Sequence, residues 1–246
     1  MRAGSLDNEM NHTIIKNGII GILVDSIGTP TTPTLKLKNT EIFNHSSYGL
    51  LGRETNIEAY NVVIGNAGQA SLAATIGGTY NFTHSTFANF WNNGLRQLPA
   101  VLVNNFFAYT DASGQEIIET RNLHAANFTN CIFDGNNNIE FVIDKVDGGG
   151  TFNYNISNSM IQFTDTNDSF KESAELDFTS SFYQNVIING KSHFRDPQKN
   201  DFIIGEESDA INKAKATLFS KDILEVDRNS SPDIGAYQHI TFEVEK

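Results

Sequence analysis

The chain has few residues that could cross-link it, carry it across a membrane or attract polyanions. Cys131 is the single cysteine in 246 residues, which excludes an internal disulfide, and we expect it to be a small core residue. No apolar run approaches the roughly 18 residues needed to span a bilayer, so membrane insertion is not expected. Only 17 Lys and Arg residues stand against 29 Asp and Glu, and the net charge of -12 argues against binding nucleic acid.

A short template recurs along most of the chain: Asn or His, two residues, a large apolar residue, one residue, then Asn. Four clear copies begin at His12, Asn39, Asn61 and His84, and weaker ones begin at Asn104, Asn130, Asn158 and Asn185. These starts lie 20 to 28 residues apart, and a period in this range is typical of a solenoid.

The residue types in the copies favour a β-solenoid over leucine-rich repeats, whose leucine spacing is absent. Each copy is rich in Ile, Val, Phe and Thr and is bounded by Asn and Gly, which predicts a short strand followed by a turn. The apolar residue of each copy should stack on its equivalents as the core row: Ile15, Ile42, Ile64, Phe87, Phe107, Phe133, Ile161 and Ile188.

The second Asn of the clear copies should lie where the chain bends. Asn tolerates the left-handed conformation that a sharp turn needs, and stacked amides can form a hydrogen-bonded ladder. The residues concerned are Asn17, Asn44, Asn66 and Asn89. At the first template position, His12 and His84 are expected to substitute for Asn as structural residues.

The last fifty residues differ from the repeats and carry three short motifs. These are Ser208-Asp-Ala-Ile-Asn212, Asp222-Ile223 with Arg228, and Asp233-Ile-Gly-Ala-Tyr237. The pattern resembles the C-terminal signature of secreted bacterial right-handed parallel β-helix proteins of the pectate-lyase-like superfamily. It departs from that signature at Asp209, Glu225 and Gln238, where the family has Pro, Gly and Glu.

The repeats and this resemblance together imply an all-β fold, a right-handed parallel β-helix of about eight coils with a C-terminal cap. Residues 1–193 are the expected solenoid and residues 194–246 the capping tail. We expect the tail to lie as a lid across the last coil, with Ala210–Phe219 as one short helix. The apolar lid residues would be Ile203, Ile204, Ile211, Leu218, Ile223, Ile234 and Tyr237. Asp227, Arg228 and Asp233 are expected to form a structural salt-bridge cluster.

The beginning of the chain shows neither a signal-peptide pattern nor an amphipathic helix before the His12 copy. An open coil presents unpaired strand edges, so solenoids need capped ends. We therefore expect earlier coils, a cap and an export signal to precede residue 1 in a longer protein. An unusual short cap within residues 1–11 is the alternative, and end-to-end contact with another chain is left open.

The resemblance brings in enzymes that act on polysaccharides. Lyases of the superfamily need a Lys or Arg base, and Ca²⁺ or a basic group to neutralise a uronic carboxylate. Arg53, Arg96, Arg121 and Lys145 fall 12 to 17 residues after their copy starts, so they could share one face and line a groove. The alternative is that unequal loops scatter them as solvated surface charges.

Hydrolase and metal chemistry have weaker signals. A hydrolase would need clustered Asp residues, and Asp134 and Asp144 are the nearest candidates. The acidic loops 144–147 and 165–168 could hold Ca²⁺, but neither has the spacing of an EF-hand, so we assign no metal ligands.

Aromatic residues offer a route to carbohydrate binding without catalysis. An exposed Trp91, with Tyr80 or Tyr109, could stack on a sugar ring, and His124 lies near Arg121 in the sequence. Packing in the core or in a turn is the alternative. Two functions are therefore considered: a secreted or cell-surface module that is a scaffold or binds glycans, and a polysaccharide-active enzyme resembling the lyases.

Overall fold

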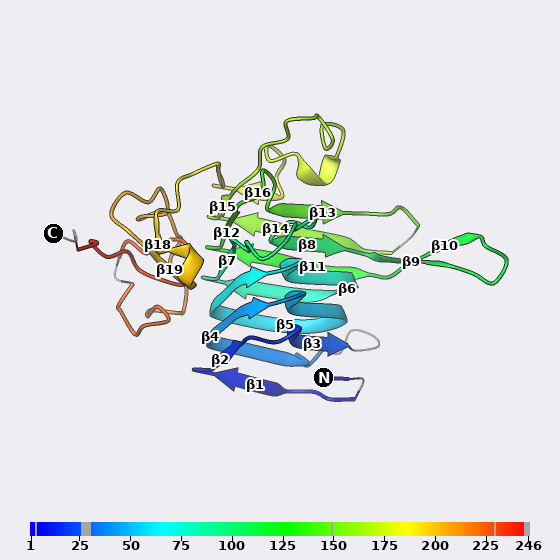
Figure 1. Cartoon of the computed structure of the whole chain (residues 1–246), viewed down its shortest axis with the longest axis horizontal. Helices are drawn as coiled ribbons and strands as arrows, with labels where there is room; N and C mark the ends of the chain where they lie inside the picture. The colour runs from blue at the N-terminus through cyan, green and yellow to red at the C-terminus, as the bar shows by residue number, and fades with distance from the viewer. Residues whose placement is uncertain (3, 26–30, 149, 229, 244–246) are drawn as a thin grey trace.

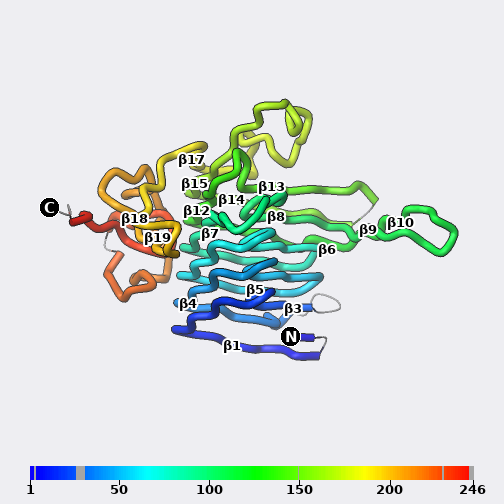
Figure 2. Tube along the Cα trace, in the orientation of Figure 1, coloured from blue at the N-terminus to red at the C-terminus, as the bar shows by residue number. Residues whose placement is uncertain are grey.

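The chain folds into a parallel β-helix, in which successive coils stack on one another through backbone hydrogen bonds (Figures 1 and 2). The computed structural model describes residues 1–246 apart from 3, 26–30, 149, 229 and 244–246. Nine of the parallel strands form a path that curls through 301°. The predicted all-β solenoid is thus confirmed.

The strands line three faces of the solenoid. The first face contains β1 (Asn8–Asn11), the start of β4 (Leu35–His45), the middle of β5 (Tyr48–Ala67), the end of β6 (Ala70–Thr83), β11 (Leu123–Thr129), β14 (Phe152–Ser157) and β16 (Tyr183–Gln184). The second contains β2 (Ile14–Lys16), the ends of β4 and β5, β7 (Thr86–Asn89), β12 (Ile132–Gly135), β15 (Met160–Ile161) and β17 (Ile187–Ile188). The third contains β3 (Ile20–Asp25), the starts of β5 and β6, β8 (Val101–Asn104) and β13 (Phe141–Asp144).

The predicted core row is present with one exception. In the second face, seven of the eight predicted residues stack in register: Ile15, Ile42, Ile64, Phe87, Phe133, Ile161 and Ile188. Four aromatic rings fill the middle of the interior, with Phe87 stacked on Phe133 at 5.4 Å and Phe82 on Phe128 at 5.5 Å. Cys131 is buried beside them, and burial raises the pKa of its thiol to about 12, so its role as a core residue is confirmed.

The prediction that Asn104 starts a coil is wrong. Phe87 is directly paired with Phe133, so the whole segment from His84 to Asn130 makes one coil. Most of its extra length is a hairpin of β9 (Phe106–Thr110) and β10 (Glu116–Thr120), which projects from the solenoid on the right of Figure 1. Phe107 is therefore 47% exposed instead of stacked in the core.

Left-handed residues form the first corner of every coil and the second corner of the first three coils. The first corner joins the first face to the second, and the second corner follows the second face. At the first corner the residues with positive φ are His12, Asn39, Asn61, His84, Asn130, Asn158 and Asn185. At the second corner Asn17, Asn44 and Asn66 have φ of 64°, 59° and 48°, whereas Asn89 does not adopt this conformation. The predicted bending role is therefore confirmed for Asn17, Asn44 and Asn66 and is wrong for Asn89.

A ladder of side-chain hydrogen bonds follows part of the first corner. Asn61 Nδ2 donates to Asn39 Oδ1 at 3.0 Å, and Asn39 Nδ2 donates to Asn11 Oδ1 at 3.2 Å. Further along, Asn130 Nδ2 lies 2.9 Å from His84 Nε2. His84 therefore fills a ladder position as a structural residue, as its place in the template predicts.

The tail runs along the side of the solenoid, so the predicted lid across the last coil is wrong (Figure 2). Its apolar residues cover the outer surface of the second face, where Phe202, Ile223 and Tyr237 pack with Val63 and Ala88. Tyr237 Oη donates to Glu41 Oε1 at 3.0 Å, which brings the end of the chain back to an early coil. Of the predicted lid residues, Leu218 is 98% exposed.

The last coil is covered by a different segment. This segment is the polar run that follows Phe163. It folds over the top of the stack with η1 (Ala174–Leu176), and Phe170 and Phe178 pack beside Phe163 at 6.1 and 4.9 Å (Figure 1). These rings protect the final coil from water.

Two details of the tail also differ from expectation. Residues Ala210–Phe219 form no helix, and the regular elements in the described part of the tail are β18 (Phe194–Asp196), β19 (Asp201–Ile204) and η2 (Pro197–Lys199). Arg228 is buried and donates to Asn61 Oδ1 at 3.0 Å and to the carbonyls of Asp233, Gly235 and Ala236, rather than to carboxylates. Asp233 instead contacts His239 Nδ1 at 2.7 Å.

Within the part of the chain that the structure describes, no helix is long and apolar enough to cross a membrane.

Candidate functional site

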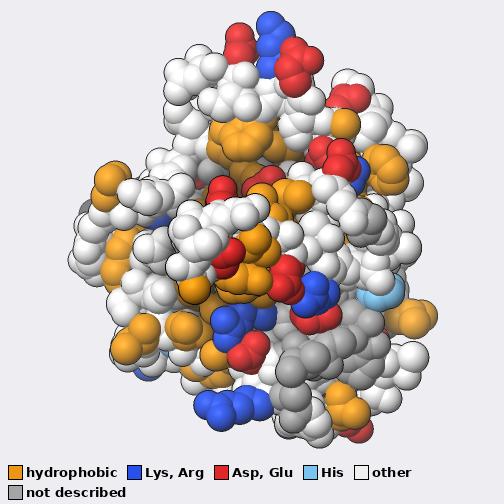
Figure 3. Space-filling view, turned by 90° about the vertical axis from the view of Figure 1, so that its right-hand side faces the viewer, with side chains coloured by type: hydrophobic (Ala, Val, Ile, Leu, Met, Phe, Trp, Pro, Cys, Tyr) orange, Lys and Arg blue, Asp and Glu red, His pale blue; other side chains and the backbone are white. Residues whose placement is uncertain are grey.

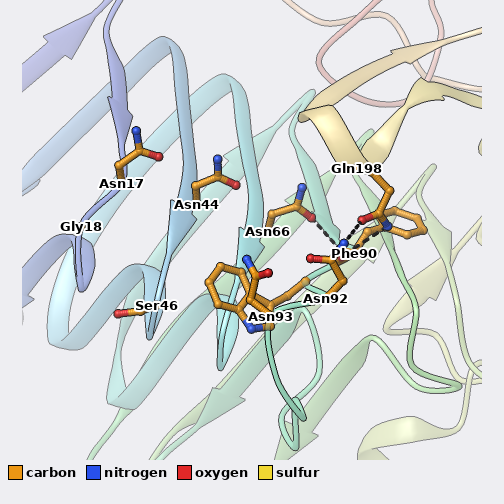
Figure 4. Close-up of a pocket in the computed structure, with 10 residues that line it drawn as sticks. Asn17, Gly18, Asn44, Ser46, Asn66, Phe90, Asn92, Asn93 and Gln198 are labelled. Atoms are coloured by element: carbon orange, nitrogen blue, oxygen red, sulfur yellow. Dashed lines mark hydrogen bonds between the residues drawn. The ribbon is translucent and has the colours of Figure 1, made fainter.

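A polar groove of about 430 Å³ lies along the second corner, where the first three coils bend (Figure 4). Asn17, Asn44 and Asn66 lie in a row on successive coils and point their amides toward it. The other lining residues are Gly18, Ser46, Phe90, Trp91, Asn92, Asn93 and Gln198. All ten lining residues are uncharged, although the protein as a whole is acidic.

The three amides of the row differ in what they bind. Asn66 is 4% exposed; its Nδ2 donates to Pro197 O and Asn200 Oδ1, both at 2.8 Å, and its Oδ1 accepts from Phe90 N at 2.8 Å. Among the described residues, the side chains of Asn17 and Asn44 have no hydrogen-bond partner, and both remain accessible. The amides of Asn17 and Asn44 are therefore available to a ligand, whereas the amide of Asn66, next in the row, is already hydrogen-bonded to the protein.

One side of the groove is formed by the loop that leaves the fourth coil, residues 90–100. The loop begins after Asn89, which lies at the second corner but does not adopt the left-handed conformation. The side-chain amide of Asn89 bonds instead to the backbone of Ala67 on the previous coil. The indole of Trp91 lies over Gly68, where a Cβ would come within 3.5 Å of it, and Asn136 Nδ2 donates to Trp91 O at 3.0 Å. Trp91 is thereby held at the groove while part of its surface stays exposed.

Arg96, predicted to line a catalytic groove, is instead the internal anchor of this loop. Its side chain is 2% exposed, and the guanidinium forms a two-pronged ion pair with Glu140, whose side chain is fully buried. It also donates to Leu98 O at 2.7 Å, to Asn89 O at 3.0 Å and to Asn136 Oδ1 at 2.9 Å. Burial raises the pKa of Glu140, and the positive charge of Arg96 opposes that rise. A side chain so enclosed cannot reach a polysaccharide.

The other three basic candidates are each engaged with acidic groups. Arg53 lies 2.7 Å from Asp25, Arg121 lies 2.9 Å from Glu119 and 3.6 Å from Glu54, and Lys145 lies 2.8 Å from Asp147. On the side of the solenoid from which the hairpin projects, Lys and Arg side chains alternate with Asp and Glu (Figure 3). Their catalytic role stays a prediction, and the described structure contains no basic stripe at these residues.

The aromatic and histidine candidates do not form one site. Tyr80 is fully buried in the core, and burial raises the pKa of its hydroxyl, so it cannot stack on a sugar. Tyr109 stacks on Phe107 in the hairpin at 5.4 Å, and His124 is exposed on β11. Of the four residues, Trp91 alone lines the groove.

The acidic candidates are also separated. Asp134 is on β12 of the second face, where Ser192 Oγ donates to it, whereas Asp144 is on β13 of the third face. Burial raises the pKa of both carboxyls, with Glu175 adding to the effect at Asp144. In the described ranges, no three His, Cys, Asp or Glu residues group in a way that could hold a metal ion.

Sequence reasoning assigned Asn17 and Asn44 to the turn and missed that their side chains line a groove. A usable signal was present: the second Asn recurs in the first three coils, and the fourth coil continues from it into Phe-Trp-Asn-Asn. A scan against models of protein families gives no match, and a search of curated proteins gives none either.

Proposed function

We propose that the protein is a non-catalytic β-helix module that binds a neutral glycan in the groove of Asn17, Asn44 and Trp91. The observation that carries this proposal is the combination of open amides on neighbouring coils with an indole in one uncharged groove. The volume of about 430 Å³ falls within the range of roughly 300–1,000 Å³ found for ligand pockets.

The chemistry of the lining suits sugar hydroxyls. An amide offers both donors and an acceptor, which matches a hydroxyl group that also does both. The side-chain amides of Asn17 and Asn44 have no protein hydrogen bonds to lose among the described residues, so a ligand would displace only water from them. The C–H face of a pyranose ring is apolar and can cover the exposed part of Trp91.

The absence of charge in the lining selects between ligand classes. A uronic acid polymer would bring carboxylates to a groove whose lining offers no Lys or Arg, on a protein of net charge -12. Long-range repulsion would slow its approach, and no ion pair would compensate. A neutral polysaccharide avoids both costs.

The enzyme hypothesis is less well supported. Its basic candidates are ion-paired with Asp or Glu, and its acidic candidates lie on different faces. The likeness of residues 194–238 to secreted bacterial pectate-lyase-like proteins supports a location outside the cell or at its surface, where a glycan would be met. Fold likeness alone does not decide between binding and catalysis.

The test is affinity gel electrophoresis in soluble β-glucan, xylan, mannan and galactan, with pectate and alginate as acidic probes. We expect retardation by at least one neutral polymer, and a loss of affinity of about tenfold or more in Trp91→Ala because a stacking surface is removed. Asn44→Ala should weaken binding about two- to tenfold.

Tyr109→Ala is the matched control, because it removes an exposed aromatic ring outside the groove. An unchanged affinity in Trp91→Ala, or retardation by the acidic polymers alone, would contradict the proposal. Ultraviolet absorbance from unsaturated products in the same incubations would instead favour the lyase hypothesis.

A further inference from the structure

The groove has a closed end. Asn92, from the loop after β7, donates to Gln198 Oε1 at 2.6 Å, and Gln198 Nε2 donates to Phe90 O at 3.4 Å. Figure 4 shows Asn92, Phe90 and Gln198 gathered beyond Asn66, at the opposite end of the row from Asn17. Two segments more than a hundred residues apart in sequence thus meet to form a wall across the line of the groove.

The wall extends to the third coil through Asn66. Its amide donates twice to the segment 197–200 and accepts from Phe90, so all three of these bonds tie the tail or the loop to the solenoid. The position at Asn66 is therefore occupied by residues of the protein itself. The free binding positions begin at Asn44 and continue to Asn17.

We infer that the groove binds the end of a neutral glycan chain, with the terminal sugar against the wall of Asn92 and Gln198 and the chain running along the solenoid axis past Asn44 and Asn17. This inference rests on the proposed function and adds its binding mode. An internal segment would have to continue through Gln198, whereas a terminal sugar needs space on one side only.

The spacing of the coils supports the axial direction. Neighbouring strands of a β-helix lie about 4.8 Å apart, so Asn17 and Asn44 present equivalent amides at close to the length of one sugar ring in an extended chain. Each successive sugar would meet the same kind of group. Trp91, held over Gly68, lies beside the positions nearest the wall.

The experiment is titration calorimetry with β-1,4-linked gluco-, xylo- and manno-oligosaccharides of two to about six sugars and with the parent polymers of known chain length. End binding predicts one protein molecule per chain at every length, and an affinity per chain that stops rising after about three sugars. Binding of several protein molecules to one long chain would overturn the inference while leaving the proposed function intact.

A variant sharpens the result. Gln198 is exposed on η2, so Gln198→Gly should leave the fold unchanged and open the wall. We expect the number of protein molecules bound per long chain to rise above one in this variant, with Lys199→Gly, on the same short helix but outside the groove lining, as the control. An unchanged ratio of one in Gln198→Gly would contradict the role of the wall. If no oligosaccharide or polymer binds the wild-type protein, the proposed function fails as well.

Discussion

At the first corner Asn61 and Asn130 bend the chain and bond to the tail, whereas at the second corner Asn17 and Asn44 bend the chain and leave their amides open. The backbone requirement is the same, since Asn61 has φ of 50° and Asn44 has φ of 59°. The two corners differ in what covers the side chains: the carbonyls of Lys221 and Lys215 accept from the amides of Asn61 and Asn130, while no described residue bonds to the side chain of Asn44. One residue type therefore serves stability at one corner and is available for a ligand at the other.

The largest effect is expected from removing the ion pair that shapes the second corner. Glu140→Ala leaves the buried guanidinium of Arg96 without its carboxylate and also removes the acceptor for Ala100 N and Asn137 N. Breaking a buried ion pair in this way costs about 3–5 kcal/mol. We expect a loss of that size in the free energy of unfolding, measured by urea denaturation.

The matched control for this change is Arg121→Ala, which removes a solvent-exposed ion pair. Its unfolding midpoint should stay close to that of the wild type. If Glu140→Ala behaved in the same way, the loop of residues 90–100 would not depend on the pair.

The corners can be compared directly by making the same substitution in each. Asn61→Ala removes the acceptor of Arg228 and the donor to Lys221 O, so we expect a loss of about 2–3 kcal/mol. Asn44→Ala forfeits only the tolerance of Asn for a left-handed turn, at about 1 kcal/mol. Its larger effect should be on glycan affinity.

Urea denaturation and affinity electrophoresis on both variants give the answer. Equal losses of stability would mean that the tail does not set the two corners apart. A loss of glycan affinity in Asn61→Ala, without unfolding, would indicate that the ligand binds at the first corner and would contradict the proposed groove.

The first corner should also respond to acid. Burial, assisted by the charge of Arg228, lowers the pKa of His84 from its ordinary value of 6.5 to about 3. The neutral form is thus favoured on folding, and its contribution to stability is complete above pH 6.5 and disappears as the pH falls toward 3. Between pH 7 and pH 5 the loss amounts to about 2 kcal/mol.

His84→Asn introduces the residue that occupies this position in most coils and cannot titrate. Its free energy of unfolding should fall less steeply between pH 7 and pH 5 than that of the wild type, by about the amount given above. Parallel pH profiles for the two proteins would show that His84 is not kept neutral by the fold.

Much of the fold can be predicted from the sequence because stacking repeats one requirement at a fixed phase. Ile42, Ile64 and Phe87 occupy equivalent core positions, so any one of them supports the others. The site could not be found in this way. Whether Asn44 or Asn66 is open depends on where residues 197–200 pack, more than a hundred residues later, and no local pattern records that contact. Arg96 was misplaced for the same reason, since its partner Glu140 is 44 residues away.

The smallest effect is expected from the hairpin that was mistaken for a coil. Asn105 O accepts from Arg121 N at 2.8 Å, so the hairpin can be cut at its base by joining these residues with an Asn-Gly turn in place of residues 106–120. Because β9 and β10 form a separate two-stranded sheet, we expect the free energy of unfolding to change by less than about 1 kcal/mol. A loss of several kcal/mol in urea denaturation would mean that the segment from Asn104 supports the stack, as a true coil would. We expect both the stability and the glycan affinity to stay unchanged, because the hairpin projects away from the stack and contributes no residue to the groove. That result would mean that both properties depend on the corners of the solenoid and not on the hairpin.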